Sequence, residues 1–264
     1  MRQQDTICDF STSDSWVVLS PIEQSIKKKI EAVGTPLKDW DINIYRGVLT
    51  GCNEAFIIDT AKRDEIISNC QTEDERKRTA ELIRPILRGR DIKKYGYVEN
   101  GLFLINTHNG IRGKLPRIDI NDYPAVKAHL DRYWDKISAR ADKGDTPYNL
   151  RNCAYLEDFN KPKIIYPDIC TFLSFELDTS CFYLSNTAYF LITEKEEHLK
   201  YFLRVLNSSV MDWYYRTLSV QLGEKAVRMF SIYVLNIPIP PISDEPIEEI
   251  LKLSKEEKLF ISGS

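Results

Sequence analysis

The residues Lys163-Ile164-Ile165-Tyr166-Pro167-Asp168-Ile169 open the part of the chain that decides the fold class. They are the first of three β-rich runs, and the next two span Cys181 to Ser185 and Ala188 to Thr193. Glu196 to Leu218 then predicts two consecutive helices, which are rich in Leu, Trp and Tyr and are broken around Asn207-Ser208-Ser209. Strands that are grouped together and followed by helices predict a mixed α+β fold.

The N-terminal part begins with a well-signalled helix. Ser20 to Glu23 matches a capping box with Pro at the first helical position, and apolar residues follow at helical spacing until Gly34. We expect β-rich runs from Ile42 to Leu49 and from Ala55 to Asp59. A second capping box at Thr72 to Glu75 predicts a helix that ends near Pro85.

The other segments are predicted in the same way. Gly101 to Asn106 predicts a strand followed by a polar loop, and an apolar face predicts one long helix from about Asp122 to Ala141. Pro238, Pro240 and Pro241 are expected to stop regular structure before a short amphipathic helix over Ile247 to Phe260. We therefore expect an N-terminal helix and linker over residues 1–38, one domain over 39–242 and a C-terminal helix over 243–264.

Composition indicates an ordinary folded protein. The chain has 264 residues, of which 43% are hydrophobic, and no stretch approaches eighteen apolar residues. The first thirty residues lack the pattern of a signal peptide, so we expect a cytoplasmic protein without membrane contact. The six cysteines are scattered without a Cys-x-x-Cys pair, which argues against a metal site.

The charge distribution is compatible with DNA binding although the net charge is −3. Residues 61–117 carry 13 Lys or Arg against 8 Asp or Glu, whereas residues 243–264 carry 3 against 6. A basic central stretch suits a phosphate backbone, but such charge runs are more often solvated faces.

No complete active site can be found in the sequence. Gly110-Ile111-Arg112-Gly113-Lys114 lacks the spacing of a P-loop, and a nucleophile elbow and a zincin helix are missing. Asp168 and Glu176 are similar to the spaced acids of metal-dependent nucleases, but Asp178 stands where such enzymes need a lysine.

Five blocks of sequence carry a family resemblance. They are Gly47 to Phe56, Ile83 to Ile92, Arg140 to Arg151 with Pro147-Tyr148-Asn149-Leu150, Lys161 to Tyr166, and a last group comprising Leu206-Asn207-Ser208, Gln221-Leu222-Gly223 and Ile237 to Pro240. Together the chain resembles the TaqI-like C-terminal specificity domain of type IIG restriction-modification enzymes and adenine-specific DNA methyltransferases.

The resemblance implies a largely antiparallel α+β target-recognition domain with flanking and C-terminal helices. It further implies that this chain reads double-stranded DNA while a catalytic part methylates adenine or cleaves. That part would belong to the same polypeptide or to a separate subunit. S-adenosylmethionine and Mg²⁺ are expected only there. This chain has no Asn-Pro-Pro-Tyr motif to hold a flipped adenine, no cofactor-binding Gly motif and no complete metal triad, so we expect no cofactor and no catalysis from it alone.

Candidate DNA-contacting residues follow from side-chain chemistry. Arg88 and Arg90 flank Gly89, where they either clamp phosphates or pair internally with Asp91 or Glu54. Lys225 and Arg228 follow a Gly-containing loop and are the better phosphate candidates. Asn109, Arg112 and Lys114 lie in the loop from Asn106 to Arg117, which either reads bases or is a solvated turn.

Two other functions stay open at this point. The chain could be a nuclease that uses Asp168 and Glu176, or an interaction module whose terminal helices, Pro21 to Val33 and Ile247 to Phe260, dock on a methyltransferase subunit. Tyr95, Tyr97, Trp213, Tyr214 and Tyr215 could stack on single-stranded bases, although such aromatic residues more often belong to the core.

Overall fold

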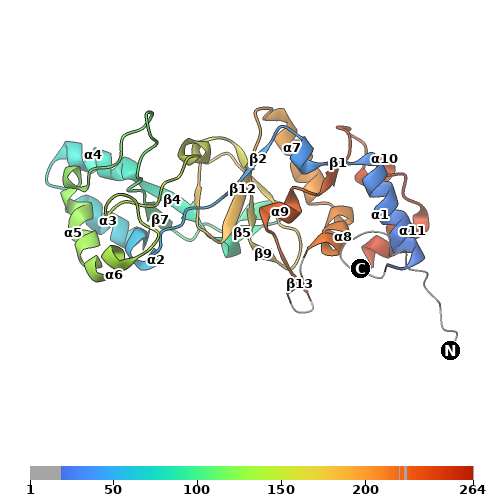
Figure 1. Ribbon diagram of the computed structural model, residues 1–264, viewed down its shortest axis with the longest axis horizontal. Coiled ribbons are helices and arrows are strands. Elements are labelled where there is room, and N and C mark those ends of the chain that lie inside the picture. Colours follow the sequence, from blue (N-terminus) through green and yellow to red (C-terminus); the bar gives the residue numbers. More distant parts are fainter. Residues whose placement is uncertain (1–18, 220, 223–224, 264) are drawn as a thin grey trace. The chain divides into compact units, whose positions relative to one another are not determined.

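The computed structural model describes residues 19–219, 221–222 and 225–263, which are traced in Figure 1. Their segments group into two structural units that alternate along the chain. The central unit comprises Asn43–Asp168 and Glu176–Ile192. The terminal unit comprises Ile169–Phe175 and the described residues of Met1–Ile42 and Thr193–Ser264. Parts of the stretch 39–242 therefore fall in both units.

Two four-stranded sheets form the centre of the central unit. The first has the order β10-β8-β12-β2 and is antiparallel throughout. The second has the order β11-β4-β7-β3, in which only β11 and β4 are parallel. The strands are β2 (Asn43–Arg46), β3 (Ile57–Asp59), β4 (Ile83–Leu87), β7 (Leu102–Ile105), β8 (Lys163–Pro167), β10 (Glu176–Asp178), β11 (Tyr183–Leu184) and β12 (Ala188–Ile192). The predicted α+β fold with largely antiparallel strands is confirmed.

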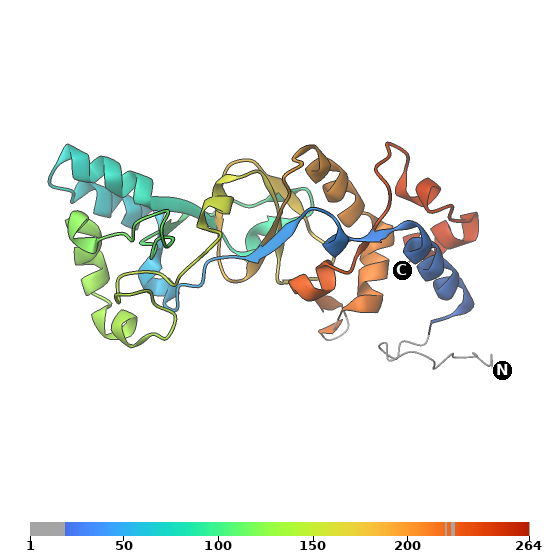
Figure 2. The same cartoon turned by 45° about the horizontal axis from the view of Figure 1, so that its top comes forward.

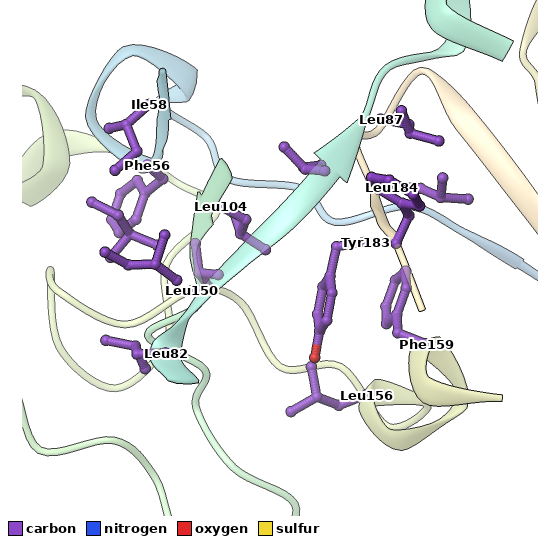
Figure 3. Close-up of a cluster of buried hydrophobic side chains, with 14 of the residues drawn as sticks. Phe56, Ile58, Leu82, Leu87, Leu104, Leu150, Leu156, Phe159, Tyr183 and Leu184 are labelled. Atoms are coloured by element: carbon purple, nitrogen blue, oxygen red, sulfur yellow. The ribbon is translucent and has the colours of Figure 1, made fainter. Parts of the chain in front are cut away.

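One apolar cluster joins these sheets into a common core. Figure 3 shows side chains from distant parts of the central unit's sequence in this cluster, with Leu104 between Phe56 on one side and Tyr183 on the other. The rings of Phe159 and Tyr183 stack with their centroids 4.6 Å apart. Burying one such large side chain contributes about 1.5–3 kcal/mol to folding, so the cluster is the main source of stability in this unit.

The helices of the central unit differ from the prediction at several places, one of which is an unpredicted helix over Thr60–Ser68. The helices are α2 (Asn53–Phe56), α3 (Thr60–Ser68), α4 (Glu73–Leu82), α5 (Pro124–Asp131) and α6 (Trp134–Ala139), with short 3-10 turns at Gly89–Asp91, Ile120–Asp122 and Leu156–Asn160. The run from Ala55 is helical before it becomes β3, so the strand begins two residues later than expected. The prediction of one long helix from about Asp122 to Ala141 is also wrong. The backbone N–H groups of Arg132 and Tyr133 donate to the carbonyls three residues before them, which ends α5.

The terminal unit contains the helices that precede and follow the central sheets. These are α1 (Pro21–Val33), α7 (Glu197–Leu206), α8 (Ser209–Leu218), α9 (Ser231–Val234), α10 (Ile247–Ile250) and α11 (Lys255–Ser262). The capping box of α1 is formed by Ser20 and Glu23 as predicted. The break between α7 and α8 is also confirmed. Ser208 caps α8, and the buried Asn207 amide exchanges hydrogen bonds of 2.9 and 3.0 Å with the backbone of Phe175.

Two C-terminal expectations are corrected. Pro238 lies in a two-residue strand, β15 (Pro238–Ile239), that pairs with β1 (Thr35–Pro36), where both prolines tolerate the edge position. The expected single C-terminal helix is two helices, because Lys252 adopts a positive φ of 52° between them. None of the helices in the described ranges is long and apolar enough to cross a membrane.

A buried carboxylate fastens α11 to α1, and Figure 2 shows these two helices side by side. Glu257 accepts hydrogen bonds from Ser25 at 2.8 Å and from Lys29 at 2.6 Å. It also accepts the backbone N–H of Ser254 and so completes the capping box of its own helix. Burial opposes ionisation of Glu257, but these donors outweigh it and lower the pKa to about 2.

Candidate nucleic-acid interface

The loop from Asn106 to Arg117 contains a tight hairpin. Ile111 and Leu115 exchange backbone hydrogen bonds of 2.8 and 2.9 Å, and the Lys114 N–H donates to the Ile111 carbonyl at 2.9 Å. Gly113 has φ 76° at the third turn position, where type II turns require a positive φ. Arg112 consequently stands at the second turn position, exposed at the tip.

Gly110 fixes the entry to this hairpin. Its φ is 75°, and a Cβ atom there would lie 2.4 Å from the Leu115 carbonyl oxygen and 2.7 Å from the Arg117 nitrogen. Only glycine permits such a close approach of two backbone segments. The hairpin therefore has one defined backbone path, which orients the residue at its tip.

A buried asparagine supports the hairpin from below. The amide nitrogen of Asn149, 1% exposed, donates to the Ile118 carbonyl at 2.9 Å and, at longer range, to the carbonyls of Thr107 and His108. Its oxygen accepts from the Thr146 hydroxyl at 2.6 Å. These bonds join both ends of the loop to the same side chain.

Arg140 organises the segment that carries Asn149. Its buried guanidinium donates to the carbonyls of Thr50, Asp142, Pro147 and Asn149. It also lies 4.5 Å from the centre of the Phe56 ring, and burial lowers its pKa. Sequence reasoning assigned no role to Arg140 or Asn149; the available signal was that both belong to the block Arg140 to Arg151.

Asn109 performs a structural task within the same loop. Its amide nitrogen donates to Asp145 at 3.0 Å and to Asn152 at 2.6 Å, and its oxygen accepts the Asp145 N–H at 2.9 Å. Each hydrogen-bonding atom of the amide thus has a partner within the fold. Base reading by Asn109 would require these bonds to break.

The basic residues of the hairpin differ in how they are paired. Lys114 bonds Glu157, and Arg117 lies 3.3 Å from Asp145. For Arg112, no ion pair or side-chain hydrogen bond is found among the residues that the structure describes. The hairpin lines a hollow of about 850 Å³ whose other wall includes Asp145, Asn152, Cys153 and Ala154.

The two arginines beside Gly89 are in different situations. Arg88 forms a bidentate pair with the buried carboxylate of Asp91, with both bonds at 2.9 Å, which is the internal pairing considered from the sequence. Its side chain keeps 28% exposure. Arg90 is exposed, and its guanidinium has no carboxylate partner within the described ranges.

Lys225 and Arg228 belong to the terminal unit. Lys225 is exposed just before β14 (Ala226–Arg228), which pairs with β13 (Gln221–Leu222) and with β9 (Ile169–Cys170). Arg228 is half-buried, with its guanidinium 5.2 Å from the Phe230 ring. These two cations and the candidate cations of the central unit thus lie in separate structural units.

Asp178, which stands where a metal-dependent nuclease needs a lysine, is engaged within the fold. Asp178 forms an ion pair of 2.6 Å with Lys163, which lies directly opposite it in the β8–β10 ladder, and both side chains are fully buried. Asp178 also accepts the N–H groups of Ser180 and Phe182. No group of three His, Cys, Asp or Glu residues that could hold a metal is present among the residues described.

The aromatic residues considered for base stacking are mostly buried. Trp213, Tyr214 and Tyr215 are buried, as expected of core residues, whereas Tyr95 is 56% exposed.

His108 belongs to the loop from Asn106 to Arg117. Burial lowers the pKa of His108, and its Nδ1 accepts the Gly110 N–H at 3.1 Å. His108 therefore helps to shape the hairpin.

Comparison with known proteins connects this geometry to a family. Residues 84–239 match the family model described as the TaqI-like C-terminal specificity domain. A curated relative, the type II methyltransferase M.PaeR7I of Pseudomonas aeruginosa, is 24% identical over 237 residues. The alignment covers 89% of this chain but 38% of that methyltransferase, so the chain spans well under half of its relative's length.

Solved structures show the same fold. The type IIL restriction-modification enzyme MmeI, in complex with DNA, superposes with a TM-score of 0.54 at 14% identity, over 76% of this chain and 25% of that one. The type IIG restriction endonuclease BpuSI superposes with a TM-score of 0.50 at 15% identity, and the match covers 90% of this chain and 27% of that one.

Proposed function

Since the chain belongs to the family of TaqI-like C-terminal specificity domains, we propose that it recognises a specific sequence in duplex DNA for a restriction-modification enzyme. Adenine methylation, DNA cleavage or both would be carried out by a catalytic part with S-adenosylmethionine and Mg²⁺. The chain's 38% share of the M.PaeR7I length leaves room for such a part. It would form a continuous polypeptide with this module or a separate subunit.

The observation that carries the proposal is the placement of Arg112. A guanidinium has five donors in a planar fork and can donate two parallel hydrogen bonds to the O6 and N7 atoms of guanine in the major groove. Arg112 combines exposure with a rigid hairpin backbone and the absence of an internal partner among the described residues. A contact that discriminates bases needs this preorganisation, because a side chain that must first be ordered loses binding free energy.

The neighbouring cations would supply the part of the affinity that does not depend on sequence. Arg90, Lys225 and Arg228 are candidates for phosphate contacts, and Arg88 keeps enough exposure to add one while it holds Asp91. Lys114 forms an exposed ion pair with Glu157, so its contact with DNA would replace an interaction of small energetic value. Phosphate contacts position the duplex, and the hairpin then reads it.

The test is a selection of bound sequences from a randomised duplex library, followed by affinity measurements with Arg112→Ala. We expect a preferred site for the natural chain. In the variant we expect the free energy that discriminates against a wrong base to fall by about 1–3 kcal/mol at one base pair, while non-specific DNA binding is retained. Arg117→Ala, which removes an internally paired arginine of the same loop, serves as the control. A uniform loss on all sequences would make Arg112 a phosphate contact, and no sequence preference in the natural chain would refute the proposal.

The catalytic partner is expected to contact the terminal unit. Leu259 on α11 is 72% exposed beside a hollow of about 390 Å³ that Pro246 and Ile261 also line. A pull-down with the methyltransferase part tests this contact. Leu259→Glu should abolish capture if α11 is the docking element, and unchanged capture would exclude that helix.

A further inference from the structure

A second basic hairpin belongs to the central unit, at the label β5 in Figure 1. Its strands are β5 (Ile92–Lys93) and β6 (Gly96–Tyr97), and the register pairs Lys93 with Gly96. The loop is thus only two residues long, Lys94 and Tyr95. Tyr95 has φ 56°, in the left-handed region that residues with a bulky side chain rarely adopt.

The base of this hairpin is held firmly. The buried Asp91 carboxylate accepts two hydrogen bonds from the Arg88 guanidinium, one at 2.9 Å from the Arg88 backbone N–H and one at 2.8 Å from the amide of Asn100. The Val98 N–H donates to the Asp91 carbonyl at 2.8 Å. The Tyr97 ring packs edge-on against Phe182 with the centroids 5.0 Å apart. The two residues of the loop are therefore displayed from a rigid support.

The tip itself is open and positively charged. Arg90, Lys93 and Lys94 are all exposed, and none has a carboxylate partner in the part of the chain that the structure describes. The ammonium of Lys93 donates to the Arg90 carbonyl at 2.8 Å, and that of Lys94 lies 5.9 Å from the Tyr95 ring. A Cβ atom at Gly96 would meet nothing within 4 Å, so this side of the hairpin is bare.

Exposed lysines alone are ordinary, but the tyrosine is not explained by folding. Tyr95 is 56% exposed, and its backbone conformation would be less strained with Gly or Asn at this position. Stability of the isolated chain therefore favours another residue. An aromatic side chain that stands there at a conformational cost, directly after two lysines that have no carboxylate partner among the described residues, has the composition of a nucleic-acid contact.

We propose that the hairpin of residues 92–97 is a second DNA-binding element, distinct from the hairpin of Arg112. Lys93 and Lys94 bind consecutive phosphates, and the Tyr95 ring packs against the nucleotide between them. This inference rests on the proposed function and adds a contact that does not require a specific base.

Three substitutions of Tyr95 separate binding from folding. Tyr95→Phe keeps the ring, so DNA affinity should be unchanged. Tyr95→Asn and Tyr95→Gly relieve the backbone, so the midpoint of thermal unfolding should stay level or rise while affinity falls about fivefold or more. Equal affinity of Tyr95→Asn and the natural chain would overturn the role of the ring.

The lysines are tested by the salt dependence of DNA binding. Lys93→Ala with Lys94→Ala should lower the slope of log affinity against log salt by about 0.9 for each phosphate that is no longer neutralised. The control removes Lys28 and Lys200, which are exposed on α1 and α7, and so makes the same change in net charge. A slope equal to that of the control would refute the phosphate contacts.

The two proposals fail in different ways. If Arg112→Ala loses discrimination at one base pair but the variants of Lys93, Lys94 and Tyr95 bind DNA like the natural chain, only this inference is wrong. If the natural chain shows no affinity for any duplex, both are wrong.

Discussion

The side-chain amide nitrogen of Asn149 holds both ends of the loop that carries Arg112, so replacing this one atom tests the support of the hairpin. In Asn149→Asp the NH₂ group that donates to the Ile118, His108 and Thr107 carbonyls becomes an oxygen. An ionised carboxylate would then face carbonyl oxygens at a position that is 1% exposed. The shape of the side chain is unchanged, so the effect is electrostatic.

The size of the effect follows from these contacts. Loss of the 2.9 Å bond to Ile118 costs about 1 kcal/mol, and leaving the carbonyl unpaired adds about 1–3 kcal/mol. Burial of the unpaired charge adds to both, so we expect the free energy of unfolding to fall by about 3–5 kcal/mol at pH 7. This loss is a large part of the free energy of unfolding of a typical protein, which is roughly 5–15 kcal/mol.

The sign of the pH dependence makes the prediction specific. Burial and facing carbonyls raise the folded-state pKa of the new carboxyl above its unfolded value of about 3.9. The destabilisation is then present above the folded-state pKa and shrinks as the pH falls below it, because a protonated carboxyl can donate one hydrogen bond. The difference from the natural chain should therefore narrow between about pH 7 and pH 5.

Urea unfolding at both pH values measures the effect. Asn43→Asp, at an exposed position of β2, is the matched control and should change stability by no more than about 0.5 kcal/mol. A loss below about 1 kcal/mol for Asn149→Asp at pH 7, or a loss that is equal at both pH values, would refute this account of the hairpin's support.

Other perturbations test separate parts of the structure. Glu257→Gln removes a carboxylate with a folded-state pKa of about 2, so the natural chain should lose stability as the pH falls from about 4.5 toward 2, and the variant should show a flatter acid transition in circular dichroism. Lys163→Met leaves the buried Asp178 carboxylate without its cation and should lower the free energy of unfolding, measured in urea, by about 3–5 kcal/mol. Lys163→Met combined with Asp178→Leu should lower it by less, and equal losses in the two variants would contradict the ion-pair account. Replacing Lys225 and Arg228 by Ala should flatten the salt dependence of DNA binding on every sequence alike, and an unchanged slope would remove both from the phosphate contacts.

The loop from Asn106 to Arg117 illustrates how far the site could be predicted. Its two glycines and the exposure of Arg112 were evident from local sequence, whereas the burial of Asn106, Thr107 and Gly110 was not. The engagement of Asn109 and Lys114 was not, since their partners Asp145 and Glu157 lie 36 and 43 residues away along the chain. Arg140 was missed for a similar reason, because an arginine after a predicted helix has no local feature that marks it as buried.

The sequence alone determined the features that depend on neighbouring residues. The Ser20 capping box, the break between α7 and α8 and the β-rich runs from Lys163 to Ile192 all follow from interactions within a few positions. Only the tertiary structure decided which strands pair, where the helix after Asp122 ends, and which cations stay unpaired. These depend on contacts between distant segments, and a distant partner can engage a side chain, as Glu157 does with Lys114, or leave it open to solvent, as with Arg112 among the residues described.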